Sequence, residues 1–251
     1  MIPSLNMFEF HPFSIVTSPH EKKIQLLIKS SGQWTSKLNY LAKDGPKKIQ
    51  LYIEGPYGEL EFNINTSDVI IIITGGVGMT PALSIYNDLG HRYINKTSSF
   101  NKVIYVWIQR DTRLLQMNAM FTIPNVSQVT NETNDSNGGI SMKVLNRIEP
   151  NGNNIDDPVF ESHLYFTRAN KEDIQIDIPI LKGTNVNIGK PDLKTIFSNI
   201  IQYCKKCDLY KVGVIACGPE SMIEEVTTEV HSNNKNFDNI KFQLHLEEFN
   251  F

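Results

Sequence analysis

The chain has 251 residues, 40% of them hydrophobic and 20% charged, and a formal net charge of -3 at pH 7. This composition is typical of a globular protein with length for one large or two modest domains, and it lacks the basic surplus of a nucleic-acid-binding protein. The longest apolar run is far shorter than the roughly 20 residues of a membrane helix, no signal peptide is recognisable, and three cysteines make no disulfide framework, so we expect a reducing, cytosolic setting.

Residues 1–64 predict a small β region. Three segments read as strands: residues 9–16, 23–29 and 49–54. Pro12 confines the first of them to a sheet edge or a bulge, and a short helix carrying Leu38 and Leu41 follows the second. These strands are too few to close a barrel or to bury a core. We therefore expect a partial antiparallel β domain that lacks its upstream strands.

The rest of the chain is organised around residues 68–88. The apolar run 69–73 has the length of a strand buried on both faces, and three glycines follow it: Gly75, Gly76 and Gly78. Thr80 is placed as a helix N-cap, with Pro81 at the first helical position. A strand, a glycine turn and a helix N-terminus together favour a phosphate or dinucleotide site. The spacing is not GxGxxG, so an ordinary strand-to-helix turn stays open as the alternative.

Strands and helices alternate from residue 65 to the end. Further strands are predicted at residues 103–108, 164–168, 212–216 and 240–246, and helices at about 113–121 and after residues 192 and 219. This alternation predicts an α/β domain with a parallel sheet, spanning residues 65–251. Residues 124–158 are rich in Asn, Ser, Asp and Gly, and we interpret them as a long, partly disordered insertion.

Seven short motifs occur in an order that resembles the dehydrogenase region of the ferric reductase and NADPH oxidase family, which is similar to ferredoxin-NADP reductases. They are residues 11–14 (HPFS), 32–35 (GQWT), 55–58 (GPYG), 75–81 (GGVGMTP), 107–112 (WIQRDT), 189–192 (GKPD) and 217–219 (CGP). Each motif alone is unspecific, but the series covers nearly the whole chain apart from the insertion. The resemblance implies a nicotinamide-binding α/β domain preceded by a partial flavin-binding β domain.

On the flavin side, the resemblance implies that FAD contacts His11, Pro12, Phe13, Ser14, Lys29, Gly32, Trp34 and Thr35. Phe13 would pack against the isoalloxazine ring, and Ser14 would hydrogen-bond near its reactive nitrogen. Thr35 would hold the pyrophosphate at a helix N-terminus, a geometry that favours anions. Without the resemblance, Phe13 reads as a core residue, His11 as a surface histidine and Thr35 as a plain helix cap.

On the nicotinamide side, the residues implied are Gly75, Gly76, Gly78, Thr80, Pro81, Thr167, Arg168, Cys217, Gly218 and Pro219. Arg168 would read the 2′-phosphate of NADPH, because a guanidinium bonds two phosphate oxygens at once. Cys217 would lie against the nicotinamide, and the terminal Phe251 would shield the flavin face. Ser14, Cys217 and Phe251 are the residues expected to act in catalysis.

The function that this resemblance implies is electron transfer from NADPH to FAD, and onward to a haem-bearing membrane domain supplied in cis or in trans. The segment would then lie at the cytosolic face of a membrane. Residues 32–35 and 54–59 favour a ferric-chelate reductase, whereas residues 109–112 lean towards a superoxide-generating NADPH oxidase. A non-catalytic nucleotide-binding regulatory module is a third alternative. Cys204 and Cys207 form a single CxxC pair, for which we expect no metal.

Overall fold

The computed structural model describes residues 1–43, 45, 47–110, 126–127, 142–143, 146–148, 154–169, 184–237 and 239–247. Three predictions lie outside these residues: the helix at 113–121, most of the insertion, and the placement of Phe251. Within the described part of the chain, no helix combines the length and the apolar character that crossing a membrane requires.

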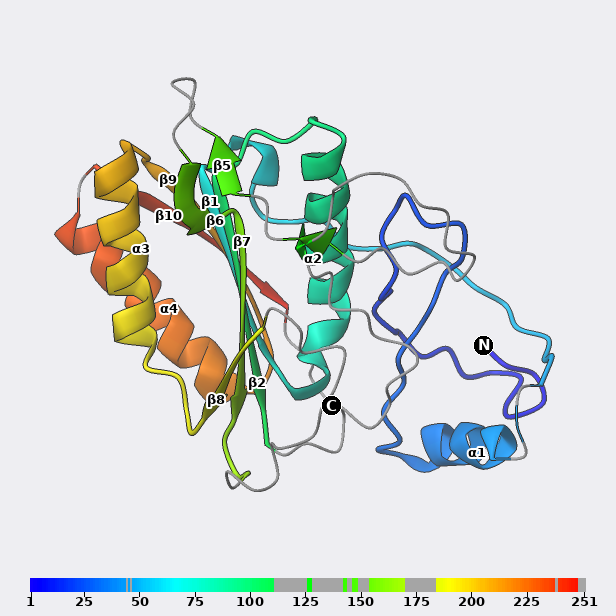
Figure 1. Cartoon of the computed structure of the whole chain (residues 1–251). Coiled ribbons are helices and arrows are strands. Elements are labelled where there is room, and N and C mark those ends of the chain that lie inside the picture. The colour runs from blue at the N-terminus through cyan, green and yellow to red at the C-terminus, as the bar shows by residue number, and fades with distance from the viewer. Residues whose placement is uncertain are drawn as a thin grey trace.

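A six-stranded, fully parallel sheet forms the centre of the molecule (Figure 1). Its order is β10-β9-β1-β2-β7-β8, and every neighbouring pair runs in parallel. The strands are β1 Val69–Gly75, β2 Lys102–Gln109, β7 Phe160–Phe166, β8 Asn185–Ile188, β9 Lys211–Cys217 and β10 Lys241–Glu247. The predicted parallel α/β sheet is confirmed, and β8 is a strand that the sequence pattern did not indicate.

Helices cover both faces of this sheet, as Figure 1 shows. Ile70 and Ile72 pack with α2 (Met79–Ile94), whereas Ile71 and Ile73 pack on the opposite face with α3 (Leu193–Cys207) and α4 (Glu220–Asn236). Alternate residues of a strand point to opposite faces, so a continuous run of isoleucine fills both layers of the core at once. This explains why the strand carries no polar face.

The glycine turn leads into α2 without an N-cap residue at Thr80. A short 3₁₀ helix, η2 (Gly76–Gly78), is followed directly by Met79, so the chain is already helical before Thr80. The Thr80 hydroxyl donates to the Val77 carbonyl at 3.0 Å. The expected cap position is therefore wrong by two residues. Pro81 is still tolerated, because the amides of the first helical turn have no intrahelical acceptor.

The α3 and α4 layer is fixed by two polar side chains. The Asp192 carboxylate caps α3, accepting from the Thr195 amide at 3.3 Å and from the Thr195 hydroxyl at 2.7 Å, and these bonds lower the pKa of Asp192. On α4, the side-chain amide of Asn234 accepts from the Phe242 amide and donates to the Phe242 carbonyl, both at 2.9 Å. Asn234 thus hydrogen-bonds the backbone of β10, the strand at one edge of the sheet.

A buried ionic cluster joins β2 to β7. The Glu161 carboxylate lies 2.7 Å from His163 Nε2 and 3.0 Å from Lys102 Nζ, and the Lys102 side chain is only 8% exposed. The hydrogen bond from His163 and the nearby Lys102 ammonium lower the pKa of Glu161 to about 2, although burial opposes the shift. The carboxylate is therefore held ionised by its two neighbours.

The N-terminal region contains α1 (Gln33–Ala42), as expected, and η1 (Ile64–Thr66). The segments predicted as strands are extended, but they form no named strand. Their antiparallel pairing includes a bridge between Ile15 and Leu26, where the Val16 amide donates to the Gln25 carbonyl at 3.0 Å. A second, long-range backbone pairing joins Met1 to Tyr52, whose amide donates to the Met1 carbonyl at 2.9 Å while the Met1 amino group donates to the Tyr52 carbonyl at 2.8 Å.

Four short strands fall inside the predicted insertion at residues 124–158. They are β3 Val126–Ser127, β4 Met142–Lys143, β5 Asn146–Ile148 and β6 Asn154–Pro158, paired as β3 with β4 and β5 with β6. Two of them fall in the 140–148 segment, the most apolar part of the insertion. The other residues of the insertion lie outside the described part of the chain.

Candidate cofactor site at the carboxyl edge of the sheet

The strand order reverses direction between β1 and β9. From β1 the chain adds β2, β7 and β8 on one side, and it then returns to place β9 and β10 on the other side of β1. In open parallel sheets, ligands bind beyond the carboxyl ends of the strands at such a switch point. Thr74 and Cys217 are register partners there, so the turns after β1 and β9 lie side by side.

Three glycines allow these two turns to pack closely. A Cβ placed on Gly75 would lie 2.6 Å from Pro219 Cδ, and one on Gly218 would lie 2.9 Å from the Gly75 amide nitrogen. A Cβ on Gly78 would collide with the carbonyl group of Cys217. The sequence therefore needs glycine at these positions for packing, whether or not a ligand is bound.

Gly76 differs from the other glycines of the turn. Its φ is +60°, a conformation that favours glycine, and a Cβ built on it meets no atom within 4 Å. Its carbonyl is fixed by two side chains from the end of β2: Trp107 Nε1 at 3.3 Å and Gln109 Nε2 at 3.0 Å. The turn thus has one open side next to a helix N-terminus, an arrangement suited to a phosphate group.

Cys217 ends β9 and is fully buried. Burial, and secondarily the Glu247 carboxylate, raise the pKa of its thiol to about 12. The thiol therefore stays protonated at neutral pH and is a poor nucleophile. In this structure the side chain is covered, so its contact with a nicotinamide stays a prediction.

Glu247 and His245 are neighbours of Cys217 that sequence reasoning missed. Glu247 is the register partner of Cys217, and the His245 ring lies 3.1 Å from the Glu247 carboxylate and lowers its pKa. His245 Nδ1 accepts the Glu61 amide at 3.3 Å, so the last strand is also joined to the segment that precedes β1. The sequence signal that could have identified them is their position at the end of the strand predicted at residues 240–246.

Two arginines lie at adjacent strand ends. The Arg168 amide donates to the Arg110 carbonyl at 2.8 Å, and Thr167 bonds the Gln109 carbonyl through its amide and, at 3.2 Å, its hydroxyl. Both arginines are exposed, and neither has an ion-pair partner within the described part of the chain. The sequence analysis named Arg168, the last residue of the strand predicted at 164–168, as a site residue, but not Arg110, which follows the strand predicted at 103–108.

Lys190 forms an ion pair on the surface of the molecule. Its ammonium forms an ion pair with the Glu225 carboxylate of α4, and both side chains are well exposed. Such surface pairs contribute little to stability. The lysine of the 189–192 motif is nevertheless paired with Glu225 in this structure.

Three of the residues predicted to contact FAD form an aromatic cluster. The Trp34 ring centroid lies 4.4 Å from that of His11 and 5.9 Å from that of Phe13, with the Phe13 and Trp34 rings stacked. Trp34 is 9% exposed, and its Nε1 has no hydrogen-bond partner within the described residues. A buried N–H without an acceptor is rare, and a ligand oxygen would satisfy it.

The hydroxyl of Thr35 is already in use. It accepts from the Ser31 and Gly32 amides, both at 3.0 Å, and donates to the Gly32 carbonyl at 3.1 Å. An anion at this helix N-terminus would therefore meet the backbone amides of the first turn instead of the Thr35 side chain. His11 likewise has a partner, the Glu9 carboxylate at 3.1 Å.

The structure brings some predicted site residues together and leaves others apart. Gly75, Gly76, Gly78, Cys217, Gly218 and Pro219 meet at the switch point, and His11, Phe13 and Trp34 meet at α1. Ser14 is half-buried, whereas Pro12, Lys29 and Gly32 are exposed. Among the described residues, these last three make no contact with one another that would define a site. The described residues hold no cluster of three His, Cys, Asp or Glu side chains suited to a metal, and all three cysteines are free.

Comparison with known protein families gives two matches. Residues 67–231 match the ferric reductase NAD binding domain, and residues 1–61 match an FAD-binding domain. The chain is 27% identical to human dual oxidase 1 over 98% of its own length, and 30% identical to ferric reduction oxidase 3, mitochondrial, of Arabidopsis thaliana over 51%. It spans only 16% and 18% of the length of these relatives.

Among solved structures, the FAD/NAD-binding domain of nitric oxide dioxygenase from Vibrio cholerae aligns with a TM-score of 0.46 at 13% identity, covering 95% of this chain and 78% of that one. The flavohemoglobin from Malassezia yamatoensis aligns with a TM-score of 0.45 at 16% identity, covering 94% of this chain and 47% of that one.

Proposed function

Because the chain belongs to the ferric reductase NAD-binding family, we propose that it accepts electrons from NADPH onto FAD and passes them to a haem-bearing membrane domain. The observation that carries this proposal is the convergence, at one sheet edge, of the β1 glycine turn, the β9 turn and two adjacent arginines. The transfer of a hydride is chemistry that the nicotinamide and flavin supply when both are bound. The chain binds them, orients them and excludes water.

The nicotinamide dinucleotide fits the switch point. Gly76 offers an open backbone next to the α2 N-terminus, and the β2 side chains of Trp107 and Gln109 keep that backbone in place. Its pyrophosphate would lie there, supported by Thr80 and Pro81 as part of the first helical turn. Cys217, with a protonated thiol, would position the nicotinamide without forming a bond to it.

The FAD fits the N-terminal region. Phe13 and His11 would pack on the flavin, and the unpartnered Trp34 Nε1 would donate to one of its oxygens. The amides at the start of α1 would bind its phosphates, with the Thr35 hydroxyl shaping that turn. Ser14 would lie near the reactive nitrogen. Phe251 would shield the flavin face, a role that falls outside the described residues.

NADPH is preferred to NADH in this proposal because Arg110 and Arg168 offer two guanidinium groups at the strand ends. A planar guanidinium donates two parallel hydrogen bonds to a phosphate, and NADH lacks the 2′-phosphate.

For the final acceptor, we favour a ferric chelate, with the electrons crossing a membrane whose cytosolic face carries this segment. Dioxygen is a second candidate, supported by the similarity to dual oxidase 1 over 98% of the chain. In membranes from cells that express the protein, ferric reduction that survives added superoxide dismutase supports the first acceptor. Loss of ferric reduction in that assay, with superoxide formed, supports the second.

The test of the first step is an anaerobic titration of the FAD-loaded chain with NADPH and then with NADH, following the oxidised flavin absorbance. We expect rapid bleaching by NADPH, and Arg168→Ala and Arg110→Ala each to weaken NADPH about tenfold while leaving NADH unchanged. The matched control is Lys241→Ala, which removes an exposed cation at the opposite edge of the sheet. Bound FAD that neither nucleotide reduces would contradict electron transfer and favour a regulatory module.

A further inference from the structure

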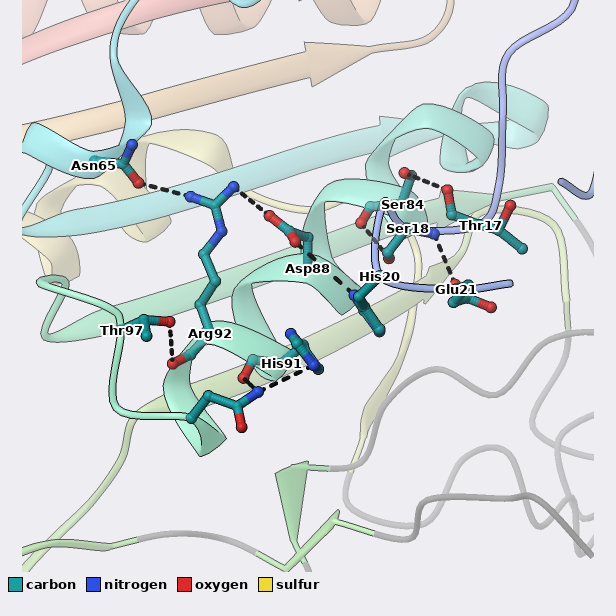
Figure 2. A network of polar contacts seen from close by, with 11 residues as sticks. Thr17, Ser18, His20, Glu21, Asn65, Ser84, Asp88, His91, Arg92 and Thr97 are labelled. Carbon is teal, nitrogen blue, oxygen red and sulfur yellow. Dashed lines mark hydrogen bonds and ion pairs between the residues drawn. The ribbon is translucent and has the colours of Figure 1, made fainter. Parts of the chain in front are cut away.

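A polar seam joins the N-terminal region to α2 (Figure 2). Ser84, on α2, donates from its hydroxyl to the Thr17 carbonyl at 2.8 Å, and Ser18 donates from its hydroxyl to the Ser84 carbonyl at 2.7 Å. Thr17 and Ser18 are 6% and 3% exposed, so both bonds are shielded from water. The two segments are 66 residues apart or more in sequence, and their exchange of hydrogen bonds fixes both distance and register.

The seam continues along α2 through charged and aromatic groups. The imidazole rings of His20 and His91 stack with centroids 3.9 Å apart and planes within 6°, and His20 Nδ1 lies 3.9 Å from the Asp88 carboxylate. Asp88 also pairs with Arg92, which donates to the Asn65 side chain at 2.7 Å. Figure 2 shows these contacts in one row, so α2 is attached to the N-terminal segment and to the linker before β1.

The packing below the seam is apolar. Val16 lies in the same core cluster as Leu83 and Tyr86 of α2 and is 7% exposed. The contact between the two regions is therefore an apolar packed interface with hydrogen bonds at its rim. Ser84 links α2 to the N-terminal segment at this interface, because it hydrogen-bonds both Thr17 and Ser18.

The Ser84 end of the seam lies close in sequence to candidate cofactor residues of both regions. Ser14 is three residues before Thr17, a chain reach of at most ~10 Å. Gly78 is six residues before Ser84, about 9 Å along the helix axis. The seam thus directly connects the segment after the expected flavin residues with the helix that follows the nicotinamide turn.

We propose that Ser84 is a positioning residue, which fixes the Ser14 segment relative to the glycine turn through its paired hydrogen bonds with Thr17 and Ser18. This inference rests on the proposed function, since it concerns the alignment of the two cofactors. Small misalignments of reacting groups reduce rates strongly, even when binding is intact. Loss of the Ser84 hydroxyl, and with it the bond to the Thr17 carbonyl, therefore acts on the transfer step and leaves each cofactor's own binding residues untouched.

The experiment compares wild type, Ser84→Ala and Ser84→Thr in the full chain. We expect Ser84→Ala to slow NADPH-dependent bleaching of bound FAD about tenfold with an unchanged NADPH dissociation constant, and Ser84→Thr to restore the rate. Thr228→Ala is the matched control, because its hydroxyl bonds the Glu224 carbonyl on the exposed side of α4, away from the seam. The control should keep the wild-type rate.

Hydrogen exchange gives a second readout that needs neither cofactor. In the cofactor-free chain, Ser84→Ala should accelerate exchange at the amides of Val16 and Ser18, which are bonded to Gln25 and Glu21, and leave β1 unchanged. Unchanged exchange in that segment overturns the proposal, whether or not FAD binds. A transfer rate within twofold of wild type also overturns it, whereas a wild-type chain whose bound flavin NADPH cannot reduce overturns the proposed function itself.

Discussion

The sheet region and the N-terminal region differ in how completely they bury their large apolar side chains. In the sheet region, strands with two partners and helices on both faces leave few large apolar side chains exposed. In residues 1–60 many are exposed: Met7, Phe8, Phe10, Ile24, Leu26, Tyr40, Leu51, Tyr52, Ile53 and Tyr57. The sheet region therefore forms its own core. The N-terminal region buries apolar side chains by packing against neighbouring elements, of which α2 is one.

The largest difference in stability between the two regions is expected when one isoleucine in each is truncated to alanine. Ile71 is 0% exposed in β1, whereas Ile53 is 67% exposed. We expect Ile71→Ala to lower the free energy of unfolding by about 4 kcal/mol and Ile53→Ala by less than about 0.5 kcal/mol, because only the first leaves a cavity. Urea unfolding measures both. Equal losses would contradict the contrast between the regions.

A smaller effect is expected when a methyl group is added to a glycine of each region. Gly78→Ala would press on the Cys217 backbone, whereas a Cβ on Gly32 meets no atom within 4 Å. We expect Gly78→Ala to destabilise by about 3 kcal/mol through overpacking, and Gly32→Ala by no more than about 1 kcal/mol through its weaker helix cap. Thermal unfolding of the two variants tests this. A Gly78→Ala variant as stable as wild type would show that the two turns do not touch.

The smallest effect concerns the charge cluster of the sheet region. The pKa of Glu161 is lowered from 4.5 to about 2, so its carboxylate contributes stability above pH 4.5 that is lost as the pH falls towards 2. We expect Glu161→Gln to cost about 2 kcal/mol at pH 7 and little at pH 2, because most of the stability that the carboxylate contributes has been lost by then.

Denaturant unfolding of wild type and Glu161→Gln at several pH values between 2 and 7 follows this loss. The control is Glu225→Gln, which removes the carboxylate of the exposed Lys190 pair and should change stability by less than about 0.5 kcal/mol. A constant difference between wild type and Glu161→Gln across that range would mean that the Glu161 charge is not the source of the effect.

Five of the six strands of the sheet were predictable from the sequence because apolar periodicity and glycine turns are local signals. The runs around Ile71 and Val214 identify buried parallel strands, and Asp192 and Pro219 mark the starts of helices. The strand β8 escaped because Asn185–Ile188 is short and half polar, and it is held mainly by its neighbour β7. Its formation depends on a partner that is distant in the sequence.

The candidate site was predictable only in part, for the same reason. Motif order pointed to Gly76 and Cys217, and the family resemblance added Arg168, but the partners of these residues come from other elements. Arg110 becomes relevant only when β2 and β7 are known to be neighbours. Ser84 reads as an ordinary polar residue on a helix surface, and its contact with Thr17 exists only through tertiary packing. Sequence patterns indicate functional residues within one helix, strand or turn, whereas this candidate site is formed by residues from several elements.

Asn234 has a consequence for how copies of this protein behave at high concentration. By bonding the amide and carbonyl of Phe242, its side chain takes the place that a neighbouring strand would occupy on β10. An exposed strand edge is a template on which another chain adds, the first step towards fibrils. At Phe242, the Asn234 side chain thus occupies the backbone groups that an added strand would need for pairing.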